Sequence, residues 1–188
     1  MPVNKHFDLI APLYERLIPP PNPGRLLALL DLPANGGWML DAAGETGRVA
    51  AMFYSLVDKM AICDLSAAML RQAAQKGGAR PAQARVERLP YADGVFHRVL
   101  VVDAFHHFGD QPGAVRELAR VLAPGGRLVM EEPDIRRFST KLIALGETIM
   151  FMGSRFRSPE VMRGMLAANG LTALIEVEAA TAWVIGEK

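Results

Sequence analysis

The sequence has little cysteine, no long apolar run and no excess of charge of one sign. Its one cysteine, Cys63, excludes an internal disulfide and any metal site built only of cysteines. Lysine and arginine number 21 against 20 aspartates and glutamates, which argues against nucleic acid as an obligatory partner. No apolar run reaches the roughly 18 residues that a membrane span needs, and residues 1–8 lack the apolar core of a signal peptide. We therefore expect a cytoplasmic protein.

The length of 188 residues fits a single domain, residues 1–188, with its own hydrophobic core. A proline-rich stretch at 19–23 separates an N-terminal segment, residues 1–22, from the rest of the chain. Apolar side chains at helical spacing predict a short amphipathic helix in that segment, namely Phe7, Ile10, Ala11 and Tyr14. Asn22 followed by Pro23 is typical of a helix start, so a second helix is expected to run to about Leu30.

Beyond residue 30, apolar runs of strand length alternate with helical patterns. Strands are expected at about 37–41, 58–63, 83–87, 97–102 and 126–132. Helices are expected at about 46–56, 66–76, 110–122 and 136–152, and from Ser158 to Gly170. Two final runs, 171–178 and 181–186, are close enough to pair as an antiparallel hairpin. This alternation predicts an α/β fold with a parallel sheet covered by helices on both faces.

The most informative stretch is LDAAGETGR, residues 40–48, where the first apolar run ends in Asp41 and enters a turn of small residues. A second apolar run ends in another carboxylate, Asp64, twenty residues after Gly44. This order is how a doubly wound sheet holds an adenosine-bearing cofactor, with the second acid accepting hydrogen bonds from the ribose.

Two such cofactors, a nicotinamide dinucleotide and S-adenosylmethionine, fit this layout. The turn lacks the G-x-G-x-x-G register of a dinucleotide site, and the carboxylate of Glu45 would face a diphosphate unfavourably. Asp41 instead suits a ligand with an ammonium group, as the methionine end has. The dinucleotide remains the minor interpretation.

Five stretches in order resemble the motifs of class I S-adenosylmethionine-dependent methyltransferases of the small-molecule, type 11-like branch. They are LDAAGETGRVA, Asp64 with Leu65-Ser66, RVERLPYADGVFHRVLVVDAFHHF, ELARVLAPGGRLVMEEP and TAWVIGEK. The resemblance implies a Rossmann-like seven-stranded sheet of order 3-2-1-4-5-7-6 with the last strand antiparallel. It also implies S-adenosylmethionine as cofactor, S-adenosylhomocysteine as product, and residues 1–22 as a lid segment.

The resemblance also assigns cofactor-binding roles. Asp41 would order the turn and the methionine end, and Asp64 would accept from the ribose. Val86 would form an apolar wall against the adenine ring, and Glu87 could accept from its amino group. The full predicted set is Tyr14, Asp41, Ala43, Gly44, Gly47, Asp64, Leu65, Val86, Glu87 and Asp103.

Three positions of the cofactor site depart from the family pattern. Ala43 replaces the first glycine of the turn, and Glu45 replaces the second, adding a charge where the cofactor carboxylate approaches. Arg85 stands where the family usually has an acid, and a guanidinium has only donors. These changes motivate the alternative of a catalytically impaired methyltransferase-like protein that binds a partner or another ligand.

Candidate catalytic residues follow the fourth strand. They are Asp103, His106 and His107, and the first two are three residues apart, so a helical turn would bring them together. A neutral histidine near pH 7 could accept a proton from the methyl acceptor. Glu131 and Glu132, at the end of the fifth strand, are weaker candidates. The methionine- and phenylalanine-rich region after that strand suits a small lipophilic acceptor.

Overall fold

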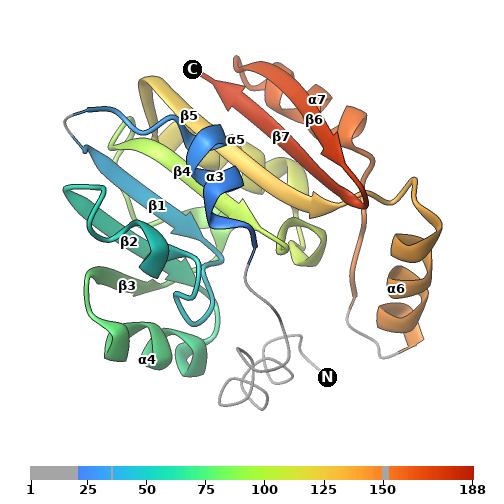
Figure 1. Ribbon diagram of the computed structural model, residues 1–188, viewed down its shortest axis with the longest axis horizontal. Coiled ribbons are helices and arrows are strands. Elements are labelled where there is room, and N and C mark those ends of the chain that lie inside the picture. The colour runs from blue at the N-terminus through green and yellow to red at the C-terminus, as the bar shows by residue number, and fades with distance from the viewer. Residues whose placement is uncertain (1–20, 35, 150–152) are drawn as a thin grey trace.

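The computed structural model describes residues 21–34, 36–149 and 153–188, and it shows a twisted seven-stranded sheet with helices on both faces (Figure 1). The helix expected around Phe7 to Tyr14 lies outside these residues, as does the end of the helix expected over 136–152.

The strands and helices alternate through the first two thirds of the chain. The strands are β1 (Trp38–Ala42), β2 (Lys59–Asp64), β3 (Ala79–Gln83), β4 (Phe96–Val102), β5 (Leu122–Pro133), β6 (Thr172–Glu178) and β7 (Thr181–Glu187). The α-helices are α3 (Pro23–Leu30), α4 (Ala67–Lys76), α5 (Gln111–Val121), α6 (Phe138–Ile149) and α7 (Pro159–Ala168). Short 3-10 helices are η2 (Ala50–Phe53), η3 (Val86–Arg88) and η4 (Phe105–His107).

The strand order is β3-β2-β1-β4-β5-β7-β6, which confirms the order implied by the family resemblance. β1 to β5 pair in parallel, whereas β7 pairs antiparallel with both β5 and β6. The chain therefore turns from β3 on one side of β1 to β4 on the other. In open parallel sheets the ligand crevice lies at such a switch point, outside the carboxyl ends of the strands.

Each face of the sheet has its own hydrophobic core. On one face, α5 and α7 pack through residues such as Leu118 and Leu166. On the other, α3, η2 and α4 pack through Leu26, Phe53 and Leu70. Burial from both sides explains why the central strands are apolar along their whole length.

Caps and prolines set the helix ends as the sequence predicts. The Asn22 side chain accepts from the Arg25 N–H at 3.2 Å, and Pro23 occupies the first turn of α3. Ser66, Asp110 and Ser158 cap α4, α5 and α7 in the same manner. The expected starts of these helices are therefore confirmed.

Two expected elements are wrong. The predicted helix over 46–56 is only the 3-10 helix η2, because Gly47 has φ 73° and Val49 provides no side-chain cap. The predicted strand over 83–87 is instead β3, four residues earlier, and residues 86–88 form η3. β3 is an edge strand, so it tolerates Pro81 and many exposed residues, and these hide it in the sequence.

No helix in the described part of the chain is both long enough and apolar enough to cross a bilayer. Cys63 is fully buried in β2, and this burial raises the pKa of its thiol to about 12. A thiol held neutral in this way serves packing rather than nucleophilic chemistry.

Candidate cofactor site and active site

The turn after β1 brings its backbone close to the end of β2. The Ala43 and Gly44 N–H groups both donate to the Cys63 carbonyl, at 2.7 and 3.2 Å. A Cβ built on Gly44 would lie 2.7 Å from the Asp41 carboxyl carbon, so only glycine fits there. Gly47 has a φ of 73°, which glycine adopts without strain. Glycine is therefore required at 44 by space and favoured at 47 by conformation.

The carboxyl group of Asp41 lies beneath this turn and is 2% exposed. Burial raises its pKa to about 7, although the neighbouring Arg48 guanidinium and the Ala50 N–H act to lower it. Its Oδ2 atom has no hydrogen-bond partner among the described residues. An unsatisfied buried oxygen fits a ligand that brings a cation or a hydrogen-bond donor, as the ammonium of S-adenosylmethionine does.

Glu45 is neither directed to solvent nor unpaired, because the Arg48 Nε lies 3.2 Å from its Oε2. Both side chains are nearly buried, at 13% and 6% exposure. Glu45 also has a φ of 53°, a conformation that glycine adopts more readily. The carboxylate that departs from the family pattern is thus neutralised by a cation three residues away.

Asp64 ends β2 and fixes the turn. Its Oδ2 accepts from the Glu45 N–H at 3.0 Å, and its Oδ1 accepts from the Ser66 N–H at 2.7 Å. A carboxylate oxygen can accept more than one hydrogen bond. The role of Asp64 as the ribose acceptor stays a prediction.

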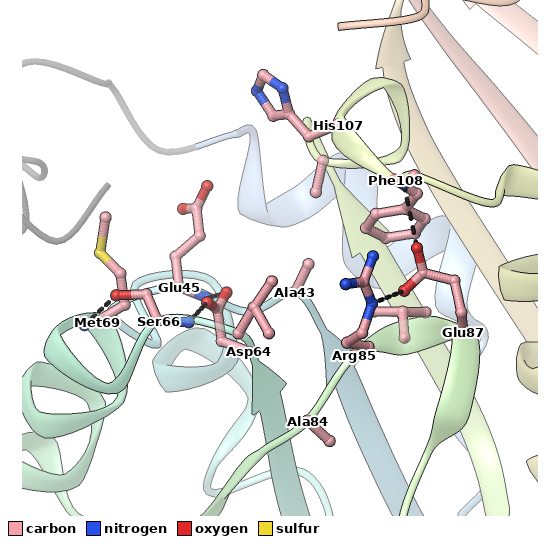
Figure 2. A pocket seen from close by; sticks show the side chains of 14 residues that line it. Ala43, Glu45, Asp64, Ser66, Met69, Ala84, Arg85, Glu87, His107 and Phe108 are labelled. Atoms are coloured by element: carbon pink, nitrogen blue, oxygen red, sulfur yellow. Dashed lines mark hydrogen bonds and ion pairs between the residues drawn. The ribbon is translucent and has the colours of Figure 1, made fainter. Parts of the chain in front are cut away.

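A cleft opens at the carboxyl ends of β2 and β3, with about 710 Å³ of empty space when open solvent is included. Figure 2 shows Glu45, Asp64 and Ser66 on one side and Arg85, Glu87 and Phe108 on the other. Six of the predicted site residues line it, namely Ala43, Asp64, Leu65, Val86, Glu87 and His107. The cleft, the orphaned Asp41 oxygen and the close approach at Gly44 together fit an S-adenosyl cofactor.

The far end of the cleft is formed by Arg85 and Glu87. The Arg85 Nε lies 3.5 Å from Glu87 Oε2. Glu87 Oε1 accepts from the Gly109 and Asp110 N–H groups, at 3.1 and 3.2 Å. Glu87 therefore joins η3 to the start of α5, a role that its sequence position did not reveal.

His106 has a partner that the local spacing did not predict, and its expected proximity to Asp103 stays a prediction. His106 Nδ1 lies 2.7 Å from Glu132 Oε2, with both side chains almost fully buried. Glu132 Oε1 accepts from the Ala104 and Phe105 N–H groups, at 2.9 and 2.7 Å. Asp103, with a φ of 50°, instead lines a second cavity of about 440 Å³ together with Arg48, Glu131 and Glu132. The sequence separation of 26 residues between His106 and Glu132 hides this pair from local spacing.

His107 lines the first cleft, and its Nδ1 lies 3.0 Å from the Ser154 Oγ. Burial and, to a smaller extent, the neighbouring His106 lower the pKa of His107 to about 3, so His107 is neutral at pH 7. The ring of His106 stacks on Phe156 at 4.2 Å, and the His106 carbonyl accepts from the Arg155 N–H at 2.7 Å. The segment 153–157 is thereby held against η4. Tyr14, the remaining predicted cofactor contact, lies outside the described residues.

Comparisons with known proteins agree with this geometry. Residues 40–130 match the family model described as a methyltransferase domain. A 107-residue stretch is 34% identical to the ubiquinone/menaquinone biosynthesis C-methyltransferase of Escherichia coli, covering 52% of this chain and 43% of that protein. The chain thus spans less than half the length of this relative.

Solved structures show the same fold. A Thermotoga maritima protein, described as an S-adenosylmethionine-dependent methyltransferase and possible histamine N-methyltransferase, superposes with a TM-score of 0.81. It is 21% identical, and the match covers 99% of each chain. Geranyl diphosphate C-methyltransferase of Streptomyces coelicolor, solved with S-adenosyl-L-homocysteine, has a TM-score of 0.72 and 14% identity over 88% of this chain and 76% of that one. The chain is thus similar to S-adenosylmethionine-dependent methyltransferases in a family model over residues 40–130, in sequence over 107 residues, and in fold and strand order.

Proposed function

We propose that this protein transfers the methyl group of S-adenosylmethionine to a small, lipophilic acceptor and releases S-adenosylhomocysteine. The observation that carries the proposal is the buried Asp41, whose unpartnered Oδ2 lies under the turn that brings Ala43 and Glu45 to the lining of the cleft. A cationic ammonium at one end and a ribose at the other would satisfy both carboxylates. The single buried cysteine suits the reducing cytoplasm, which we propose as its location.

The residues of this chain then have defined tasks. Asp41 holds the ammonium, the backbone at Ala43, Gly44 and Gly47 lies along the methionine portion, and Asp64 binds the ribose. Leu65 and Val86 lie against the adenine ring, and Tyr14 and Asp103 complete the site from the lid segment and the β4 end. The bound cofactor supplies an electrophilic methyl on a sulfonium, so positioning the acceptor in line is the main contribution of the protein.

Where the acceptor must lose a proton, we assign the general base to His106, whose side chain is 3% exposed and lines neither cavity, so this role requires the site to open towards it. Glu132 beside Nδ1 favours the tautomer with its proton on Nδ1, which leaves Nε2 as the proton acceptor. Asp103 and His107 flank this group and would contact the acceptor or the cofactor. The neutral state of His107 avoids a positive charge next to the sulfonium.

The lipophilic nature of the acceptor is supported by the relatives and by α6. The names of two similar proteins describe methylation of a quinone precursor and of geranyl diphosphate. In this chain, the apolar side chains of Phe138, Leu142, Ile143 and Leu145 on α6 are all more than half exposed. Apolar surface of this kind is typical of a ligand or partner contact.

Binding measurements test the proposal. Calorimetry and thermal unfolding with S-adenosylmethionine, S-adenosylhomocysteine and NAD should show binding of the two adenosyl ligands only. A hundredfold excess over the dissociation constant stabilises the protein by about 2.7 kcal/mol. Failure of both adenosyl ligands to bind rejects the proposal, and binding without methylation of any acceptor in a broad panel favours the impaired alternative. Asp41→Asn should weaken S-adenosylhomocysteine more than S-adenosyl analogues that lack the amino group.

A further inference from the structure

The part of the cleft next to β3 would hold the outer edge of a purine ring. Arg85 presents hydrogen-bond donors there. The side chain of Arg85 is 61% exposed, and Figure 2 shows its guanidinium turned into the cleft beside Phe108. A Cβ built on Gly109 would lie 3.2 Å from the Arg85 Nη2 atom. Glycine at 109 therefore leaves the space that the guanidinium uses.

Among the described residues that line this end of the cleft, the carboxylate is that of Glu87, and the protein itself engages it. Glu87 Oε1 accepts from the Gly109 and Asp110 N–H groups, and Oε2 faces the Arg85 Nε at 3.5 Å. Turning Glu87 towards a ligand would leave two backbone N–H groups without this acceptor. Asp64, Ser66 and the paired Glu45 lie on the opposite side of the cleft, towards the turn.

Purine bases differ at the edge that would meet Arg85. The 6-amino group of adenine is a donor and needs an acceptor, whereas a guanidinium has only donors. A 6-oxopurine presents O6 and N7 together, and arginine donates to this pair through two parallel hydrogen bonds. Because Glu87 is already engaged by Arg85 and two backbone N–H groups, a base without the amino group takes no hydrogen bond away from it.

We propose that Arg85 sets the base specificity of this cleft, so that it accepts a 6-oxopurine nucleoside, as in S-inosylhomocysteine, at least as well as the adenosyl compound. This inference rests on the proposed function, because it requires that the cleft hold an S-nucleosyl cofactor. Arg85 acts as a specificity residue that contacts the base and takes no part in methyl transfer.

The test compares the dissociation constants of S-inosylhomocysteine and S-adenosylhomocysteine by calorimetry. For the unmodified protein we expect a ratio of about one or below. Arg85→Asp replaces the donors by an acceptor and should shift the ratio at least about tenfold in favour of the adenosyl ligand. Arg88→Asp, an exposed arginine three residues away in η3, makes the same charge change and should leave the ratio within about twofold.

The outcomes separate the two proposals. If the unmodified protein binds S-adenosylhomocysteine and rejects S-inosylhomocysteine by tenfold or more, the inference about Arg85 is wrong while the proposed function stands. If neither ligand binds, the proposed function fails and the inference fails with it. The ratio for the unmodified protein decides the inference even where Arg85→Asp does not fold.

Discussion

At the scale of single residues, the Asp41 carboxyl group links stability to pH. Its pKa is raised from 3.8 to about 7, chiefly by burial, so the folded protein binds this proton more tightly than the unfolded chain. Its contribution to stability is therefore complete below about pH 4 and is lost as the pH rises to about 7. Asp41→Asn should remove this loss. Between pH 5 and 8 the variant should gain on the order of 2–3 kcal/mol relative to the unmodified protein.

Urea unfolding at both pH values measures this difference. Subtracting the unmodified protein removes the effect of His107, whose lowered pKa gives stability that is lost as the pH falls. Asp93→Asn changes a carboxyl that is 81% exposed and pairs with Arg120, and it serves as the control for the loss of a carboxylate. An equal pH slope in Asp41→Asn and the unmodified protein would contradict the raised pKa.

The Glu45–Arg48 pair gives a second prediction at this scale. Arg48→Met leaves Glu45 without its cation, so its charge faces the cofactor carboxylate, and affinity for S-adenosylhomocysteine should fall about tenfold or more. The double variant Glu45→Gln with Arg48→Met removes both charges and should recover most of that loss. A double-mutant cycle by calorimetry measures the coupling, and additive effects would show that the pair does not act as a unit.

These residues also show what the sequence could and could not predict. Asp64, Leu65 and Val86 could be placed at the cleft because the family motifs fix their positions in the sequence, even though the strand before Val86 was misplaced. The pairing of Glu45 with Arg48 is local, at a spacing of three residues, but a turn with positive φ has no simple periodicity to reveal it. The pairing of His106 with Glu132 depends on β4 and β5 being neighbours in the sheet, so it can be predicted only once the strand order is known.

At the scale of elements, Glu132 of β5 holds the loop after β4 by three interactions, two with backbone N–H groups and one with His106. Glu132→Gln keeps one acceptor oxygen but presents an amide donor to His106. We expect a loss of about 1–3 kcal/mol in unfolding free energy. We also expect turnover to fall and its dependence on pH to change, because the favoured histidine tautomer is lost.

A matched control separates positioning from stability. Glu117 of α5 also joins a loop N–H, that of Leu89, to a side chain, Arg120, but it lies outside the residues that line either cavity. Glu117→Gln should lose comparable stability with an unchanged pH profile. If Glu132→Gln and Glu117→Gln have the same profile of turnover against pH, Glu132 does not orient a catalytic group.

Helices and strands were predicted correctly where a single sequence feature determined each of them. Continuous apolar runs identified β1, β2, β4 and β5, because both sheet faces are covered, and side-chain caps identified α3, α4, α5 and α7. It failed at β3 and η2. There the strand is an exposed edge, and the turn imposes a conformation that helix periodicity does not record.

At the scale of the whole molecule, the strand order places the cleft beside β2 and β3 and the second cavity beside β4 and β5. The exposed apolar residues of α6 follow β5 in the chain, so they belong to the same half of the molecule as that second cavity (Figure 1). Because Leu142 and Leu145 are more than half exposed, replacing both by serine should change unfolding free energy by less than about 1 kcal/mol.

The same double variant tests the acceptor class. Using S-adenosylhomocysteine formation as readout, we expect the unmodified protein to methylate a quinol with an isoprenoid tail or geranyl diphosphate in preference to histamine. Leu142→Ser with Leu145→Ser should raise KM for the apolar acceptor about tenfold, since two buried apolar side chains contribute on the order of 2 kcal/mol. Affinity for S-adenosylhomocysteine should not change.

Leu56→Ser, at an exposed apolar residue before β2, should alter neither value. Preference for histamine, or an unchanged KM in the α6 variant, would show that the acceptor is polar or binds away from α6.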